Sequence, residues 1–337
     1  MAGNSRQNGN LASVSRRRLL SAAIAAPMIG RITRAQAETA GVVLIGKEGW
    51  LFELTGEFRY LSPEHLATTT SLINSAVASI KAAGIEVVIC LNPSKGRVYQ
   101  SYLPDDNSYT PTTARRYAMA LEALSKPGTL VPDIAAAFQA VRATNPDTQY
   151  FFKSDTHWTP AGAELAATTL CSAIKAKAML PPSPTPGTAL GETLRMVQGA
   201  NDLAAQLPDA LRTTYQPERY TIRKATLAGP SGLLAPGKTD TAIVGNSYMQ
   251  PKYGFADQVS NQLARPVALK WEVHSYGSYK IMLDYLQSPD FKENRPKLLI
   301  WDFHEIDMEF PPESKGFWHD FAMPNAVFLE SVKKAVG

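Results

Sequence analysis

The stretch Thr241-Ala242-Ile243-Val244-Gly245-Asn246-Ser247-Tyr248 holds a short apolar run that ends in a glycine, with a serine two residues later. A run of this kind is typical of a strand buried on both faces in a parallel sheet. The carboxyl ends of such strands carry the sites of α/β proteins, so we expect the Ser247 hydroxyl at that edge. The serine amide and the dipole of the next helix would then stabilise a developing oxyanion. The alternative, a serine that only caps a helix, stays open on this motif alone.

Strands and helices alternate on both sides of this stretch. Periodicity predicts strands at 85–91, 129–131, 241–244, 267–273 and 297–302, and helices at 63–84, 112–125, 134–144, 160–178, 248–263 and 278–287. The alternation predicts a three-layer α/β/α fold with a mostly parallel central sheet, in one domain over residues 38–337. Prolines at 181–187 predict a loop, and we expect an irregular insertion near 181–240 with a helix near 201–212 and a strand at 219–224.

Asp155-Thr156-His157-Trp158 is the second segment that carries chemistry. An aspartate two residues before a histidine can accept the Nδ1 proton, leave Nε2 as a base and stabilise the imidazolium. Such a pair can also bind a metal, but no further ligands occur nearby at the usual spacings, so we expect neither a metal nor a cofactor. A packed histidine before a capped helix is the structural alternative. Together with Ser247, the pair predicts a Ser247–His157–Asp155 triad.

Residues 1–37 have the layout of an export signal, and the paired arginines indicate the twin-arginine type. They contain six arginines and no acidic residue, a short apolar run at 19–29, and Ala35-Gln36-Ala37 as a cleavage site. The run is too short to cross a bilayer, and no later segment resembles a transmembrane helix. Without residues 1–37 the chain counts 28 basic and 30 acidic residues, so its basic character belongs to the signal. We therefore expect a periplasmic protein without a nucleic-acid partner.

Two cysteines, Cys90 and Cys171, lie in an apolar run and after a helical stretch. Neither has a Cys-x-x-Cys spacing, which disfavours redox and metal chemistry. Two buried free thiols is the preferred prediction, and a disulfide remains open for an exported protein.

The two segments, with the motifs around them, resemble the alginate O-acetyltransferases of the AlgJ and AlgX type, which are SGNH-hydrolase-like proteins of permuted topology. The resemblance covers nearly the whole chain after residue 37. It departs from the family pattern at Asn246, where the family usually has Asp, and at His304 and Ile306, where Pro and Arg are common. The segments that carry it are Gly46-Lys47-Glu48-Gly49-Trp50-Leu51-Phe52, Pro93-Ser94-Lys95, Asp155-Thr156-His157-Trp158-Thr159, Gly245-Asn246-Ser247 and Leu298-Leu299-Ile300-Trp301-Asp302-Phe303-His304-Glu305.

By position, the resemblance implies Ser247 as nucleophile, His157 as general base and Asp155 as its orienting acid. The oxyanion would be held by the Ser247 amide and by a second donor, for which we consider the Gly277 amide. Candidate substrate contacts, each with a structural role as the alternative, are Lys95, Trp158, Tyr248 and Trp301.

Three functions follow from these residues. The first is an O-acetyltransferase that moves an acetyl group through an acyl-serine to an exported polysaccharide, with the donor supplied by a membrane acyltransferase partner. The second is an acetyl esterase with the same triad, and the third is a non-catalytic polysaccharide-binding or assembly protein on the same fold.

Overall fold

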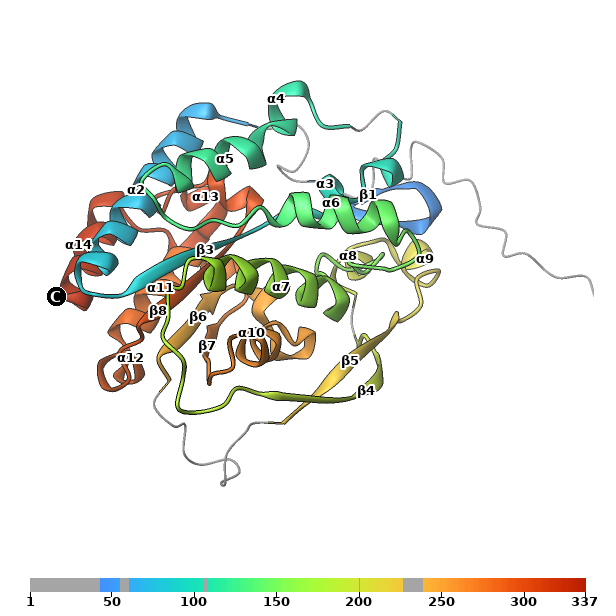
Figure 1. Ribbon diagram of the computed structural model, residues 1–337. Helices are drawn as coiled ribbons and strands as arrows, with labels where there is room; N and C mark the ends of the chain where they lie inside the picture. Colours follow the sequence, from blue (N-terminus) through green and yellow to red (C-terminus); the bar gives the residue numbers. More distant parts are fainter. Residues whose placement is uncertain (1–42, 55–60, 106–107, 200, 227–238) are drawn as a thin grey trace, which may run out of the picture.

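The computed structural model describes residues 43–54, 61–105, 108–199, 201–226 and 239–337 (Figure 1). The expected signal segment, residues 1–37, lies outside the described residues. No helix within these ranges is long and apolar enough to cross a membrane.

Four parallel strands form the central sheet, and this confirms the predicted fold class. Their order across the sheet is β3-β8-β6-β7. The chain between one strand of this sheet and the next in sequence contains helices, which carry it back to the starting edge, as a parallel sheet requires. The bounds are Glu86–Asn92 for β3, Leu298–His304 for β8, Thr241–Gly245 for β6 and Ala268–Trp271 for β7.

Alternate residues of these strands pack into two separate cores, one on each face of the sheet. On β3, Val87 and Ile89 belong to one core, whereas Val88 and Cys90 belong to the other. Trp301 and Ile300 of β8 divide in the same way. Side chains alternate between faces along a strand, so an unbroken apolar run has to be covered on both sides.

Helices cover both faces, as the three-layer prediction requires (Figure 1). One face packs against α2 (Pro63–Ala82), α5 (Arg116–Ser125), α11 (Ser278–Gln287) and α14 (Asn325–Val336). The other packs against α6 (Ile134–Thr144), α7 (Pro160–Ala176) and α10 (Phe255–Leu263). Thr159 caps α7, because its side chain accepts from the Gly162 amide at 3.3 Å.

Four predicted elements differ from the structure. The helix expected at 112–125 is divided into α4 (Pro111–Ala114) and α5 (Arg116–Ser125). The helix expected at 248–263 begins only at Phe255, after two 3-10 turns, because Pro251 and the left-handed Gly254 (φ 77°) interrupt it. The strand expected at 129–131 is reduced to one parallel bridge between Leu130 and Val88. The helix expected near 201–212 is divided into α8 (Asp202–Ala205) and α9 (Asp209–Arg212).

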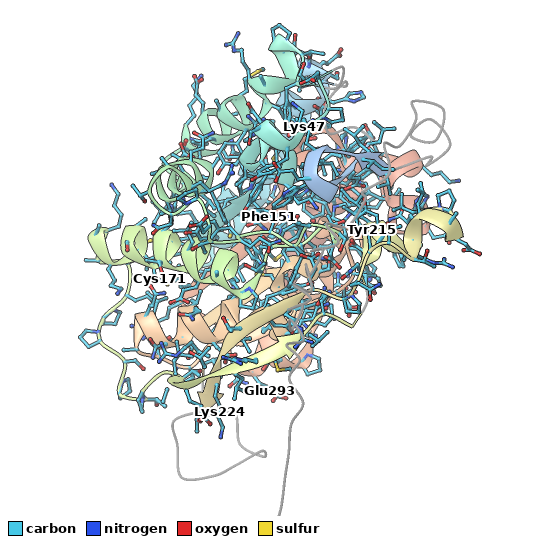
Figure 2. The ribbon with its side chains drawn as sticks, turned by 90° about the vertical axis from the view of Figure 1, so that its right-hand side faces the viewer. Lys47, Phe151, Cys171, Tyr215, Lys224 and Glu293 are labelled. Atoms are coloured by element: carbon cyan, nitrogen blue, oxygen red, sulfur yellow. The ribbon has the colours of Figure 1, made fainter. Side chains whose placement is uncertain are left out.

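The expected insertion contains a two-stranded antiparallel hairpin at one side of the molecule, where Figure 2 places Lys224 near its lower edge. Its strands are β4 (Ala189–Val197) and β5 (Arg219–Thr226), and only β5 was predicted. The Pro-rich residues 181–187 form a loop, as expected. The remaining strands and α-helices of the described residues are short, namely β1 (Val43–Ile45), β2 (Leu51–Glu53), α3 (Lys95–Val98), α4 (Pro111–Ala114), α12 (Pro289–Glu293) and α13 (Lys315–Trp318).

Candidate active site

Ser247 lies directly beyond the carboxyl end of β6, in the middle of the sheet. A side chain at Gly245 would collide with Asp302 on the neighbouring strand, since a Cβ there would lie 2.5 Å from the Asp302 Cβ. This close approach explains the glycine of the Gly-x-Ser motif. Asn246 then caps the next turn by accepting from the Tyr248 amide at 3.0 Å.

The turn that Ser247 opens is a single 3-10 turn, Ser247–Met249, and not the long helix that was predicted. Such a turn carries little of the macrodipole that a long helix supplies. Its first amide still has no acceptor within the turn, so the Ser247 N–H can donate to a ligand.

His157 and Asp155 lie on a tight loop between β-bridge partners Phe151 and Trp158, which we call the Asp–His loop (residues 151–158). The loop closes through a hydrogen bond from the Phe152 amide to the His157 carbonyl at 3.1 Å. The helix that follows at Pro160 fixes the far end of this loop.

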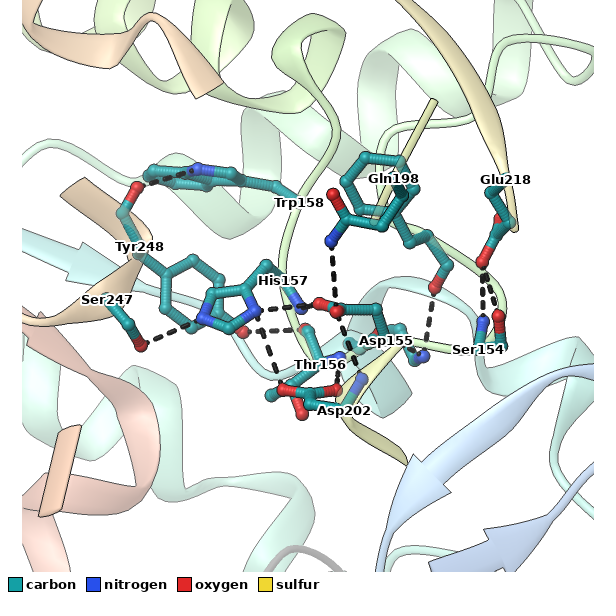
Figure 3. Close-up of polar contacts among 12 residues, drawn as sticks. Ser154, Asp155, Thr156, His157, Trp158, Gln198, Asp202, Glu218, Ser247 and Tyr248 are labelled. Atoms are coloured by element: carbon teal, nitrogen blue, oxygen red, sulfur yellow. Dashed lines mark hydrogen bonds and ion pairs between the residues drawn. The ribbon is translucent and has the colours of Figure 1, made fainter. Parts of the chain in front are cut away.

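The fold brings Ser247, His157 and Asp155 into one hydrogen-bonded chain (Figure 3). The His157 Nε2 lies 2.8 Å from the Ser247 Oγ, and the His157 Nδ1 lies 2.7 Å from the Asp155 Oδ1. Ser247 is 8% exposed and His157 9%, whereas Asp155 is 2% exposed. A buried acid, an oriented imidazole and a hydroxyl at the edge form the geometry that nucleophilic acyl transfer requires.

Four hydrogen bonds keep Asp155 ionised. Its Oδ1 accepts from the His157 amide at 2.9 Å as well as from the ring, and its Oδ2 accepts from Gln198 Nε2 at 3.1 Å and from the Asp202 amide at 3.2 Å. Burial alone would raise the pKa of Asp155, but the hydrogen bonds and the charge of His157 outweigh it and hold this pKa at about 2.

Gln198 and Asp202, which sequence reasoning missed, come from the segment near 181–240 that was expected to be an insertion. Asp202 also accepts from the Thr156 amide at 2.7 Å, and its Oδ2 lies 3.6 Å from the His157 Nδ1. Glu218, directly before β5, accepts from the Ser154 amide and hydroxyl at 2.8 and 2.7 Å. No local pattern marks these residues, because their partners are more than 40 positions away in the sequence.

The four candidate substrate contacts are buried supports in the structure. Lys95 is 4% exposed and donates to the carbonyls of Phe152, Lys153 and Asp155 at 2.8 to 3.2 Å. Its ammonium group therefore holds the Asp–His loop in place. It was a candidate substrate contact because Pro93-Ser94-Lys95 resembles a loop of the AlgJ and AlgX proteins, and the structural role was the stated alternative.

The aromatic candidates pack inside the molecule. Trp158 is fully buried and donates to the Tyr248 carbonyl at 3.0 Å, and the Tyr248 hydroxyl donates to the Thr156 carbonyl at 3.0 Å. Trp301 is fully buried in the core that lies beneath α2, α11 and α14. We therefore assign none of the three a substrate contact.

Gly277 does not suit the second oxyanion position. Its amide donates to the His274 carbonyl at 3.0 Å, and its φ of 85° places it in a tight turn before α11. The glycine serves this turn, and a Cβ there would also lie 3.3 Å from the Trp318 ring.

A second histidine–aspartate pair lies near the same edge of the sheet. The His274 Nε2 lies 2.7 Å from the Asp307 Oδ1, and Ser278 donates to the other oxygen of Asp307 at 2.9 Å. Here the serine bonds the acid and not the imidazole, so the order of groups that activates a hydroxyl is not reproduced.

Asp155, His157 and Asp202 also come close enough together to be considered as metal ligands, since their ligand atoms lie within 4.8 Å of one another. The His157 ring, however, donates from Nδ1 to Asp155 and accepts at Nε2 from Ser247. Neither nitrogen then has a free lone pair for a cation, so this arrangement favours a base over a metal ligand.

Comparison with known proteins finds curated relatives that are similar over most of this chain. A probable alginate O-acetylase AlgJ of Pseudomonas fluorescens is 30% identical over 272 residues, which cover 78% of this chain and 67% of that protein. The protein of the same name from Pseudomonas syringae pv. tomato is 29% identical over 274 residues, or 78% and 68% of the two chains.

Solved structures agree on the fold. The O-acetyltransferase domain of Pseudomonas putida AlgJ superposes with a TM-score of 0.71 at 26% identity, covering 87% of this chain and 99% of that domain. Pseudomonas aeruginosa AlgX superposes with a TM-score of 0.63 at 21% identity, over 90% and 71% of the chains, and supports the fold alone.

The family model described as an SGNH hydrolase-like domain, acetyltransferase AlgX, matches residues 43–305. That match spans both the central sheet and the Ser247–His157–Asp155 chain. The protein belongs to the AlgX family of SGNH hydrolase-like acetyltransferases.

Proposed function

We propose that this protein transfers an acetyl group through an acyl-serine on Ser247 to a hydroxyl of an exported polysaccharide. The observation that carries the proposal is the continuous hydrogen-bonded chain from Ser247 through His157 to Asp155. The similarity to AlgJ proteins, which are named as probable alginate O-acetylases, supports an alginate-type polymer as the acceptor to test first.

In the first half-reaction, the Ser247 Oγ attacks the acetyl carbonyl of the donor while the His157 Nε2 takes the hydroxyl proton. Asp155 stabilises the imidazolium, and the Ser247 amide donates to the oxyanion. The tetrahedral intermediate collapses to acetyl-Ser247, and the imidazolium returns its proton to the departing donor group.

In the second half-reaction, the His157 Nε2 takes a proton from the acceptor hydroxyl, which attacks the acetyl-serine. Collapse of the intermediate forms the sugar ester, and the imidazolium returns its proton to Ser247. Water in place of the sugar would release acetate, which is the esterase reaction. An export signal in residues 1–37, a periplasmic location and a membrane acyltransferase partner that supplies the acetyl donor complete the proposal.

The test uses a chromogenic acetyl ester with and without an oligouronate acceptor, and mass spectrometry of the sugar. We expect acetylated sugar with the wild type and a kcat at least about 10⁴-fold lower with Ser247→Ala, since the nucleophile is lost. Ser71→Ala, an exposed serine on α2, is the matched control and should keep full activity.

Labelling with a serine-directed sulfonyl fluoride provides a second measurement. The adduct should form on Ser247 in the wild type and should be slowed in His157→Ala, because the base that activates the hydroxyl is missing. Release of acetate without any acetylated sugar would favour the esterase. A folded, fully active Ser247→Ala variant would overturn the assignment.

A further inference from the structure

The inserted segment, residues 181–240, supplies half of the hydrogen bonds that hold the Asp155 carboxylate. Both donors to the Asp155 Oδ2 come from it, namely the Gln198 side chain at the end of β4 and the Asp202 amide at the start of α8. The donors to the Oδ1 both belong to His157. The acid is thus clamped between its own loop and the insertion.

Asp202 brings a second carboxylate to the Nδ1 edge of His157. Its Oδ1 accepts from the Thr156 amide, which fixes the direction of the group, and its Oδ2 lies 3.6 Å from the His157 Nδ1 (Figure 3). The Asp202 side chain is 40% exposed, whereas that of Asp155 is 3% exposed. Asp202 therefore faces the ring from the solvent side of the acid.

We infer that Asp202 is a positioning residue, a second carboxylate that stabilises the His157 imidazolium formed during acyl transfer. This inference rests on the proposed function of the Ser247–His157–Asp155 chain. Two carboxylates side by side repel each other until a positive charge forms between them, so the pair favours the imidazolium over the neutral ring. Partial burial and the nearby charge of Asp155 raise the pKa of Asp202, which is consistent with this repulsion.

The other polar and charged groups packed around His157 are either neutral or hydrogen-bonded to groups other than the His157 ring. The rings of Tyr248 and Tyr253 lie 5.1 and 5.3 Å from the His157 ring. Burial raises the pKa of Tyr253, so its hydroxyl stays neutral. Lys95 donates to three backbone carbonyls of the Asp–His loop, and Gln198 is uncharged. The Asp202 carboxylate is therefore the charged group whose substitution tests the inference.

Asp202→Asn removes this charge and keeps an oxygen that can accept from the Thr156 amide. We expect kcat/KM on its pH-independent plateau to fall about ten-fold, because the transition state contains the imidazolium. The acidic limb of the pH profile should move down by about one unit, because a less stabilised imidazolium loses its proton more readily. Asp209→Asn, on exposed α9 in the same insertion, is the matched control and should change neither value.

A comparison of Asp202→Ala with Asp202→Asn separates charge from hydrogen bonding, because Ala removes both and Asn removes only the charge. If Asp202→Asn has the wild-type plateau and the wild-type acidic limb while Ser247→Ala is inactive, the inference is overturned and the proposed function stands. If only Asp202→Ala loses activity, Asp202 acts through the Thr156 hydrogen bond, and the inference is likewise overturned. An active Ser247→Ala variant would instead reject the proposed function itself.

Discussion

At the scale of single residues, Lys95 is a buried charged side chain whose ammonium group supports the Asp–His loop. Its three carbonyl partners all belong to the Asp–His loop. Lys95→Met should therefore lower kcat by about 10² through misplacement of the base, with KM little changed. A substrate contact would raise KM instead.

The measurement for Lys95→Met is steady-state kinetics with the chromogenic ester, alongside circular dichroism to confirm the fold. Lys81→Met, at the half-buried carboxyl end of α2, serves as the control and should match the wild type. An increase in KM at unchanged kcat would show that the lysine contacts substrate after all.

Some residues of the site could be predicted from the sequence, and others could not. Ser247, His157 and Asp155 are recognisable because each stands in a local pattern, a strand end or an Asp-x-His spacing. Asp202 and Gln198 stand in no such pattern, since they reach Asp155 through tertiary contacts across more than 40 positions. A local motif identifies the groups that react, and the fold decides which groups support them.

At the scale of elements, a buried ion network joins the ends of β3 and β8. Glu305, directly after β8, accepts from Arg97 Nε at 2.8 Å, from Arg116 Nε at 3.2 Å and from the Ser94 amide at 3.1 Å. Glu305 and Arg116 are both fully buried. The network fixes the loop that carries Lys95, and Lys95 in turn holds the Asp–His loop through its hydrogen bonds.

Glu305→Gln should lower the free energy of unfolding by about 3–5 kcal/mol, because it leaves buried guanidinium groups without their carboxylate. Urea denaturation at pH 7 measures the change. Asp105→Asn breaks the exposed pair with Lys47 (2.6 Å) and should cost less than about 1 kcal/mol. Equal stability of the Glu305→Gln variant and the wild type would contradict the role of the network.

The pH dependence of stability gives a second check on Glu305. Burial opposes its ionisation, but Arg116 and Arg97 outweigh burial and lower its pKa to about 2. The unfolded chain binds a proton to this group at higher pH than the folded protein does. Its contribution to stability is therefore complete above about pH 5 and is lost as the pH falls toward 2. Glu305→Gln should lose less stability over this range than the wild type.

Elements also set the limit of what periodicity predicts. The buried strands β3, β6 and β8 were predictable because their apolar runs are unbroken. β4 was not, because most of its residues are exposed and its hairpin partner, not burial, defines it as a strand. The 3-10 turn at Ser247 was predicted as the start of a long helix. The helical periodicity already includes residues 248–249, and Pro251 and Gly254 interrupt it only after that turn.

At the scale of the whole molecule, the reactivity of the two cysteines measures how tightly the central sheet packs against α7. Cys90 lies in the middle of β3 and Cys171 on α7, both fully buried and both free, which confirms the preferred prediction of free thiols (Figure 2 labels Cys171). Burial raises the pKa of both thiols, that of Cys171 to about 12. A buried thiol in its protonated form reacts slowly, because the thiolate is the nucleophile.

We expect no rapid reaction of the native protein with a thiol reagent such as dithionitrobenzoate, and two equivalents of thiol in denaturant without added reductant. The labelling rate at low denaturant should follow the rate of global unfolding, because Cys90 is reached only when the sheet separates from α7. Cys90→Ala and Cys171→Ala, each leaving one thiol, give the two rates separately. A native rate for Cys171 faster than unfolding would show that α7 opens independently of the sheet. Fewer than two thiols in denaturant would reveal a disulfide, in conflict with the free cysteines of the structure.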